Sequence, residues 1–199
     1  MTASPISRST DIFRHCGTEM QTMGDQTPEA AKSRGPPSGV VPRRVRPKFP
    51  ERWHVPQDRS LWIKWAHADK RLKEEKVYWV STSSSAGAPH AAPVWGIWRK
   101  ERFYFETAPN SVKGRNLREN PRIAVHLQDG LDTVIIEGTA ARERDSRTLR
   151  SLRTHYTRKY DYTPDWSDEG SQVVYEVVPR IAHAWRAPGM HRTLVNFLF

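Results

Sequence analysis

Apolar and polar residues alternate in several short runs between residues 77 and 140. The runs are 77–82, 89–99, 103–107, 122–127 and 134–139. Alternation with a period of two is typical of strands with one buried face, and short turns between such runs favour antiparallel pairing. Three later runs, 172–178, 181–185 and 193–199, have the same character. We therefore predict a mainly β fold, a small antiparallel barrel whose closure leaves few exposed edges.

Two segments have helical spacing and are expected to flank this barrel. The first begins at Asp58 or Ser60, which can cap a helix, and carries Leu61, Trp62, Trp65, Ala68 and Leu72 on one face. The second spans 146–159, with Leu149, Leu152 and Tyr156 on its apolar side. We expect Trp62 and Trp65 to pack on the barrel and on a partner subunit rather than to bind a ligand.

Residues 1–50 differ in composition from the rest. They hold seven of the fifteen prolines and show no apolar period, so we predict a disordered N-terminal tail followed by one folded domain over 51–199. The basic run 43–48 could contact nucleic acid, but we interpret it as a solubilising linker.

The charge is positive but dispersed. There are 32 Lys and Arg against 22 Asp and Glu, a net charge of +10, of which +4 falls on residues 1–50 and +6 on the rest. We therefore do not expect nucleic-acid binding. Because Cys16 is a single cysteine and no apolar stretch is long enough to cross a bilayer, we expect a cytoplasmic protein without membrane contact.

The segment 107–122 is a basic turn between two predicted strands. Thr107 ends the first strand, Ser111 can cap a short helix, and Lys113 falls in the first turn of that helix. Free N–H groups and the helix dipole favour an anion at such a position, and a lysine beside them adds a charge. This turn is predicted to bind a phosphate group.

The order of the motifs resembles the pyridoxamine 5'-phosphate oxidase-like split barrels, which bind flavin or the deazaflavin coenzyme F420. The resemblance covers about 53–199 and rests on Pro93-Val94-Trp95-Gly96, Thr107-x-x-x-Ser111-x-Lys113, Asn120-Pro121-Arg122 and Glu137-Gly138-Thr139-Ala140. It implies a homodimer that holds the cofactor in a groove between two barrels.

The resemblance also implies roles for individual residues. Ser111 and Lys113 would bind the cofactor phosphate, Thr107 would approach it, and Asn116 would support the loop. The positions around the cofactor are Pro93, Val94, Trp95, Val112, Thr133 and Arg186. Trp95, next to Gly96, would form a wall of the ring pocket, and Arg186 on a late strand would reach an anionic tail.

Three departures from the family pattern narrow the choice of cofactor and of reaction. Val112 stands where flavin-binding oxidases have Arg, and Thr133 stands where they have Gln. The Tyr, Arg and Ser set that grips pyridoxal phosphate has no counterpart, so we do not expect pyridoxamine phosphate oxidation. The remaining pattern, Lys113-Gly114-Arg115-Asn116-Leu117, is similar to that of the F420-dependent branch. F420, with its glutamate tail, is the expected cofactor and FMN the alternative.

Other kinds of chemistry find no support in the sequence. It has no recognisable Ser-His-Asp set, metal-ligand spacing or P-loop. Hydride transfer needs no side-chain nucleophile because the cofactor carries the chemistry. We therefore expect an oxidoreductase acting on a small organic substrate, with His90 structural and no catalytic residue assigned. The faces that carry Tyr104 or His126 are expected to be partly buried by the partner subunit. The alternatives are a non-catalytic barrel that binds flavin, F420 or haem, and a basic nucleic-acid-binding module.

Overall fold

The computed structural model describes residues 41–50 and 58–199. The strands in it are β1 (Arg43–Val45), β2 (Tyr78–Ser83), β3 (Pro89–Val94), β4 (Gly96–Arg99), β5 (Arg102–Thr107), β6 (Arg122–Leu127), β7 (Asp132–Arg142), β8 (Val173–Arg186) and β9 (Val195–Leu198). The helices are α1 (Trp65–Glu74), α2 (Val112–Glu119), α3 (Ser146–Tyr160), the short α4 (Met190–Thr193) and a 3₁₀ turn, Arg59–Leu61. The predicted class, antiparallel β structure with flanking helices, is confirmed.

The long strand β8 organises the sheet. The pairing order is β1-β9-β8-β7-β6-β2-β3, and every pair is antiparallel. β7 follows β8 from Tyr175 to Arg186, whereas β5 pairs only with its first part, up to Val177. β9 pairs with its last part, from Ile181 to Ala184. Because β8 exchanges β5 for β9 along its length, the sheet divides at this strand into two branches.

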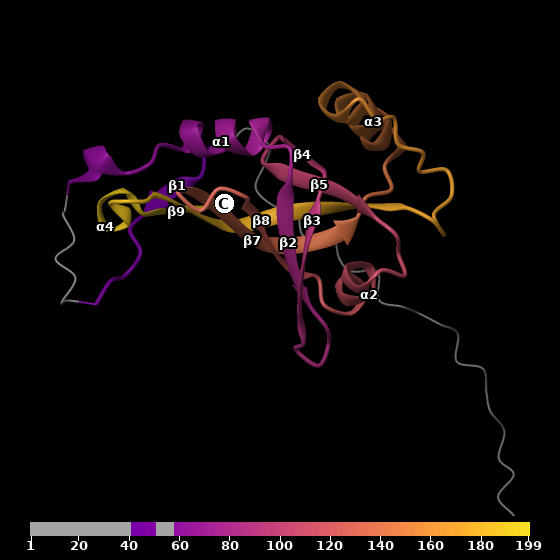
Figure 1. The fold of residues 1–199 in the computed structure, drawn as a ribbon, viewed down its shortest axis with the longest axis horizontal. Coiled ribbons are helices and arrows are strands. Elements are labelled where there is room, and N and C mark those ends of the chain that lie inside the picture. Colours follow the sequence, from indigo (N-terminus) through magenta and orange to yellow (C-terminus); the bar gives the residue numbers. More distant parts are fainter. Residues whose placement is uncertain (1–40, 51–57) are drawn as a thin grey trace, which may run out of the picture. The chain divides into compact units, whose positions relative to one another are not determined.

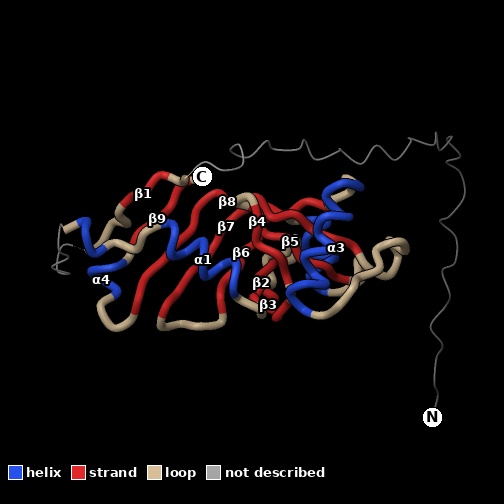
Figure 2. Tube along the Cα trace, turned by 90° about the horizontal axis from the view of Figure 1, so that it is seen from above, coloured by secondary structure: helices blue, strands red, loops and turns tan. Residues whose placement is uncertain are grey.

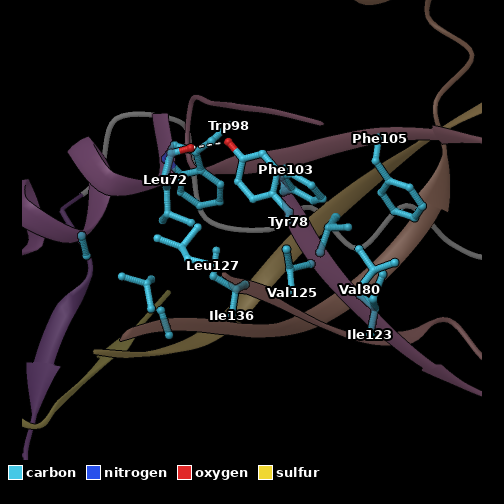
Figure 3. Packing of buried hydrophobic residues seen from close by; sticks show 14 of the residues in the cluster. Leu72, Tyr78, Val80, Trp98, Phe103, Phe105, Ile123, Val125, Leu127 and Ile136 are labelled. Carbon is cyan, nitrogen blue, oxygen red and sulfur yellow. Dashed lines mark hydrogen bonds between the residues drawn. The ribbon is translucent and has the colours of Figure 1, made fainter. Parts of the chain in front are cut away.

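The inner faces of the strands form one apolar core. Alternate residues of β2 and β6 point inward, and Tyr78, Val80 and Val125 are completely buried. Figure 3 shows these side chains with the aromatic rings of Phe103 and Phe105 from β5, and the hydroxyl of Tyr78 reaching the carbonyl of Leu72 on α1, 2.6 Å away. This bond ties α1 to the first barrel strand.

Helices cover different parts of the sheet (Figures 1 and 2). α1 packs on β4 and β7, α2 on β2 and β3, and α3 on β4. A second apolar cluster lies beneath α3, where Leu152 and Tyr156 meet Ile97, Tyr104 and Val174. α3 is thereby anchored by its own buried face.

Two predicted boundaries were wrong. Strand β1 lies inside the segment expected to be disordered, and Arg43–Val45 pairs with Asn196–Leu198 of β9; residues 1–40 lie outside the described part of the chain. The helix expected from Asp58 is interrupted, because Trp62 and Lys64 are extended and the N–H of Ile63 donates to the carbonyl of Thr193 at 3.3 Å. The true helix begins at Trp65.

The predicted runs 172–178 and 181–185 form one strand, β8. β8 continues through Pro179, which lies opposite Gly138 where the register shifts between Glu137 and Gly138. A Cβ at Gly138 would lie 2.1 Å from the carbonyl oxygen of Val178, so the bulge requires glycine. Proline lacks an N–H and is tolerated at such a bulge. The last predicted run, 193–199, is confirmed as β9 except that its first residue, Thr193, ends the short α4.

Three residues expected to meet a partner subunit are covered within a single chain. Trp62 and Trp65 belong to the core, and Trp65 packs edge-on against Phe197 with ring centroids 5.0 Å apart. Tyr104 is buried under α3 and donates a hydrogen bond to Glu176 at 2.9 Å. His126, by contrast, lies on the outer sheet face, where its ring is parallel to that of Trp79. That face still fits a partner.

Candidate cofactor-binding site

The predicted phosphate-binding segment, residues 107–113 and here called the α2 turn, leads from β5 into α2. Ser111 is the N-cap, and its hydroxyl accepts from the N–H of Gly114 at 3.1 Å. The hydroxyl of Thr107 lies 2.9 Å from that of Ser111. Ser111 and Thr107 therefore place two hydroxyls beside the first N–H groups of the helix, which have no intrahelical acceptor.

Glycine at position 114 allows the loop to wrap closely around the first helical turn. A Cβ there would lie 2.6 Å from the carbonyl oxygens of Ala108 and Pro109. The carbonyl of Gly114 also accepts from the hydroxyl of the largely buried Tyr175 at 3.4 Å. Close packing of the loop on the helix and the bond from Tyr175 thus hold the α2 turn in place.

Lys113 is partly buried at this turn. Within residues 41–50 and 58–199, its amine has no hydrogen bond or ion pair, and burial lowers its pKa below the usual value. A desolvated ammonium without a counter-charge gains from a neighbouring anion. Val112, next to it, is 42% exposed, and its aliphatic side chain offers no polar group to a ligand.

Asn116 lies on the opposite side of α2 and faces the barrel. Its side-chain amide donates to the hydroxyl of Thr82 at 3.1 Å, in a buried contact between α2 and β2. One turn later, Asn120 donates to Ser83 at 2.9 Å. These two bonds join the helix to one strand and set the position of the α2 turn.

Pro93, Val94 and Trp95 lie where the chain passes from β3 to β4. β3 pairs with β2 and β4 with β5, so this junction is a seam of the barrel. Val94 points inward, whereas Trp95 is 46% exposed. His90, further along β3, lies opposite Thr82 and so close to the strand residues that anchor α2.

Trp95 is fixed by aromatic contacts. Its ring is stacked on Tyr160, with centroids 4.8 Å apart and planes at 5°, and Tyr162 stands at its edge. The Tyr160 hydroxyl lies 2.9 Å from the nitrogen and 2.8 Å from the oxygen of Gly96. One ring face of Trp95 is therefore covered and the other is available to a flat ligand.

Thr133 and Arg186 do not join these residues within one chain. They lie at the start of β7 and the end of β8, whereas Thr107 pairs with Val173 at the start of β8. The separation along the strand is roughly 40 Å at about 3.3 Å per residue. Thr133 is buried and donates to the carbonyl of Gly130 at 2.8 Å. Only a second chain could bring these two positions to the α2 turn.

Arg186 takes part in an ionic network that the sequence analysis missed. Both carboxylate oxygens of Asp132 lie 2.9 Å from His67 Nε2, and Arg71 and Arg186 each approach that carboxylate at 3.6 Å. His67 and Asp132 are 65 residues apart in the chain, and no local pattern links them. The Arg186 guanidinium is therefore already paired with an acid.

Lys159 was also missed, although a signal for it existed. It follows Leu152 and Tyr156 at helical spacing and so falls on the buried side of α3. Its amine donates to the hydroxyl of Tyr78 at 2.7 Å and to the carbonyl of Gly96 at 3.1 Å. Burial lowers the pKa of Lys159 to about 8.

The described part of the chain contains no group of three or more His, Cys, Asp or Glu side chains able to hold a metal ion. None of its helices combines the length and the apolar character that a bilayer crossing requires.

Several solved structures share the fold. A conserved hypothetical protein from Mycobacterium tuberculosis has a TM-score of 0.56 and 22% identity, over 69% of this chain and 91% of that one. A pyridoxamine 5'-phosphate oxidase-like protein from Listeria innocua has a TM-score of 0.51 and 18% identity, over 60% of this chain and 95% of that one. The haem storage protein HutZ from Vibrio cholerae has a TM-score of 0.50 and 15% identity, over 57% of this chain and 88% of that one.

These likenesses confirm the split-barrel fold predicted from the sequence. No curated protein matches the sequence. The profile of the family described as pyridoxamine 5'-phosphate oxidase matches residues 65–186, from the start of α1 to the end of β8. Since this match covers more than half of the sequence, the chain belongs to the pyridoxamine 5'-phosphate oxidase family.

Proposed function

We propose that this protein is an oxidoreductase that binds coenzyme F420, or alternatively FMN, in a groove between two copies of the chain. It would transfer a hydride between that cofactor and a small organic substrate. The family contains flavin-binding oxidoreductases, which supports the general class. The observation that carries the proposal is the α2 turn, where Lys113, without a partner in the described part of the chain, adjoins the first N–H groups of a helix.

The donors at this turn fit a terminal or bridging phosphate. Lys113 would supply a charge, the first N–H groups of α2 would donate to phosphate oxygens, and the hydroxyls of Ser111 and Thr107 would orient it. Asn116 keeps the helix on β2 and so holds the donors in position. These groups are preorganised, which reduces the ordering cost of binding.

The absence of an arginine at position 112 favours F420 over FMN. An Arg beside Lys113 would give a bidentate grip on a terminal phosphate, and Val112 cannot provide it. The positive charge of the chain also suits a ligand with a glutamate tail.

The remaining predicted residues would shape the ring pocket. Either cofactor, when bound, supplies the hydride acceptor or donor. Trp95, braced by Tyr160, would form a rigid wall, and the backbone of Pro93 and Val94 would form the adjoining edge. Such a wall excludes water and orients a flat ring. Thr133 and Arg186 would come from the second chain.

A second candidate is a non-catalytic barrel that binds haem, because HutZ, with the same fold, is a haem storage protein. The two functions differ in what the purified protein binds. The test is an absorbance spectrum of the purified protein followed by titration with F420, FMN and haem. Tight binding of F420 or FMN supports the proposal. Binding of haem alone would replace it, and binding of none of the three would refute it.

A further inference from the structure

The outward face of α3 carries a row of cations. Its fifteen residues include five Lys or Arg and no Asp or Glu. Leu152 and Tyr156 face the core, and the opposite side, by helical periodicity, presents Arg147, Arg150, Arg153, Thr154, Thr157 and Arg158. With Ser146, these are the exposed residues of α3, so the face carries four arginines and no acid.

In residues 41–50 and 58–199, the arginines of this face lack the ion pairs that other cations have. On α1, Lys70 pairs with Glu74 at 3.9 Å, Arg71 with Glu75 at 3.8 Å and Lys73 with Asp69 at 2.5 Å. Within the residues that the structure describes, no acid lies within 4 Å of the guanidinium groups of Arg147, Arg150, Arg153 and Arg158. A solvated helix usually balances its charges as α1 does.

A hollow of about 450 Å³ lies on this face, here called the α3 hollow, and is lined by Arg153, Thr154, Thr157, Arg158 and Thr163. Thr154 and Thr157 fall between the two arginines on the helix, so they form the floor and the arginines the walls. The hydroxyl of Thr157 lies 3.0 Å from that of Thr163 and donates to the carbonyl of Arg153 at 3.0 Å. This contact holds Thr163, in the segment after α3, at the edge of the hollow.

The charge in the α3 hollow is available to a ligand. The acid influenced by Arg153 is Asp165, and its pKa is lowered mainly by hydrogen bonds from Ser167, with Arg153 a lesser cause. Guanidinium groups bind phosphate and carboxylate oxygens through paired N–H donors. Two of them on one helix, five residues and about 7.5 Å of rise apart, suit a ligand with two neighbouring oxyanions.

We propose that the α3 hollow is a second oxyanion-binding site, which takes a small molecule carrying two or more phosphate or carboxylate groups. It is separate from the α2 turn, because α2 packs on β2 and β3, whereas α3 packs on β4 and lies elsewhere in Figure 1. The proposal does not depend on the cofactor assigned above. The size of the hollow fits a small ligand better than a nucleic-acid duplex.

The experiment is calorimetric titration of the full chain, at low salt, with inorganic tripolyphosphate and separately with triglutamate. These two probes distinguish a polyphosphate from a polycarboxylate ligand. The double variant Arg153→Gln/Arg158→Gln removes both walls. The double variant Arg147→Gln/Arg150→Gln removes the same charge from the same helix outside the hollow and serves as the matched control.

We expect at least one probe to bind, and the hollow variant to bind it about tenfold more weakly, the lower end for charged hydrogen bonds. The control should lose no more than about twofold through weaker long-range attraction. Equal losses in both variants would overturn the proposal, because they would indicate diffuse attraction. It would also be overturned by absence of binding, or by an oligonucleotide that outcompetes both probes. Melting temperatures check that both variants are folded.

Discussion

Asn116 on α2 donates a hydrogen bond to the hydroxyl of Thr82 on β2, 3.1 Å away, and both side chains are buried. This contact joins the helix that begins at the α2 turn to the strand that forms the barrel wall. The stability of the fold and the geometry of the candidate phosphate site therefore depend on the same pair.

Asn116→Ala is expected to lower the free energy of unfolding by about 1–3 kcal/mol, because it leaves the buried Thr82 hydroxyl without its partner. Cofactor affinity should fall with it. Urea denaturation and titration measure the two effects. Asn120→Ala removes the less buried bond to Ser83 and an exposed bond from the N–H of Arg122. It is the control and should cost less. An equal loss of unfolding free energy in both variants would mean that the buried bond stabilises the fold no more than the contacts of Asn120.

Lys113→Ala is expected to weaken cofactor binding by roughly 1.5–3 kcal/mol, or about ten- to a hundredfold, the range for hydrogen bonds to charged groups. The melting temperature should hardly change, since Lys113 has no partner in the described structure. Arg118→Ala removes the same charge from the last turn of α2 and should leave affinity nearly unchanged. Unaltered affinity in Lys113→Ala would move the cofactor away from the α2 turn.

Val112→Arg should raise the affinity for FMN more than that for F420. The position is exposed, so the longer side chain can be accommodated, and its guanidinium can grip a terminal phosphate in bidentate fashion. Parallel titrations of the variant and the unaltered protein with both cofactors provide the measurement. A gain for F420 as large as that for FMN would contradict this explanation of cofactor choice.

The lowered pKa of Lys159 leads us to expect that the stability of the fold depends on pH. Below pH 8 its amine is protonated in both the folded and unfolded chain, and burial of the ammonium weakens the fold. Between about 8 and the usual 10.5, the folded chain releases the proton first, so the free energy of unfolding rises. The rise should be about 1–2 kcal/mol after solvent screening.

Lys159→Met should abolish this rise, as measured by denaturant unfolding between pH 7 and about 9.5. The substitution leaves Tyr78 bonded to Leu72 and the carbonyl of Gly96 bonded to Tyr160, so no buried group loses its last partner. Lys70→Met on α1 is the control and should keep the profile of the unaltered protein. A rise that survives in Lys159→Met would belong to another group.

The outer sheet face is expected to form a two-fold dimer interface. Ala124 lies on this face between Ser81 and Glu137, in the row next to Trp79 and His126. Ala124→Arg places a charge there and should shift the protein toward monomer in light scattering. Ala141→Arg, on an exposed position of β7, is the matched control. A dimer unaffected by Ala124→Arg would place the interface elsewhere.

The sequence predicted local structure better than long-range structure. Alternation located the inner strands, because Tyr78, Val80 and Val125 repeat every second residue where one face is buried. Strand β1 escaped notice because three residues of mixed character have no period, and only pairing with β9 makes them a strand. Pro179 is typical of a strand end, and only the pairing with β7 shows that β8 continues past it through a bulge at Arg180.

The same distinction applies to the candidate site. The cap at Ser111 could be predicted, since a cap depends on residues within one helical turn. The contact of Lys159 with Tyr78 spans 81 residues, and that of Asp132 with His67 spans 65. Such contacts follow from the way the strands are paired, which periodicity does not determine.

Tyr160, the last residue of α3, gives that helix a mechanical connection to the barrel seam. Its ring supports Trp95 and its hydroxyl binds both polar groups of Gly96, so a displacement of α3 must also displace the indole. Trp95 is therefore a built-in optical reporter of the position of α3. A ligand that moved α3 would therefore also change the surroundings of the Trp95 indole at the seam.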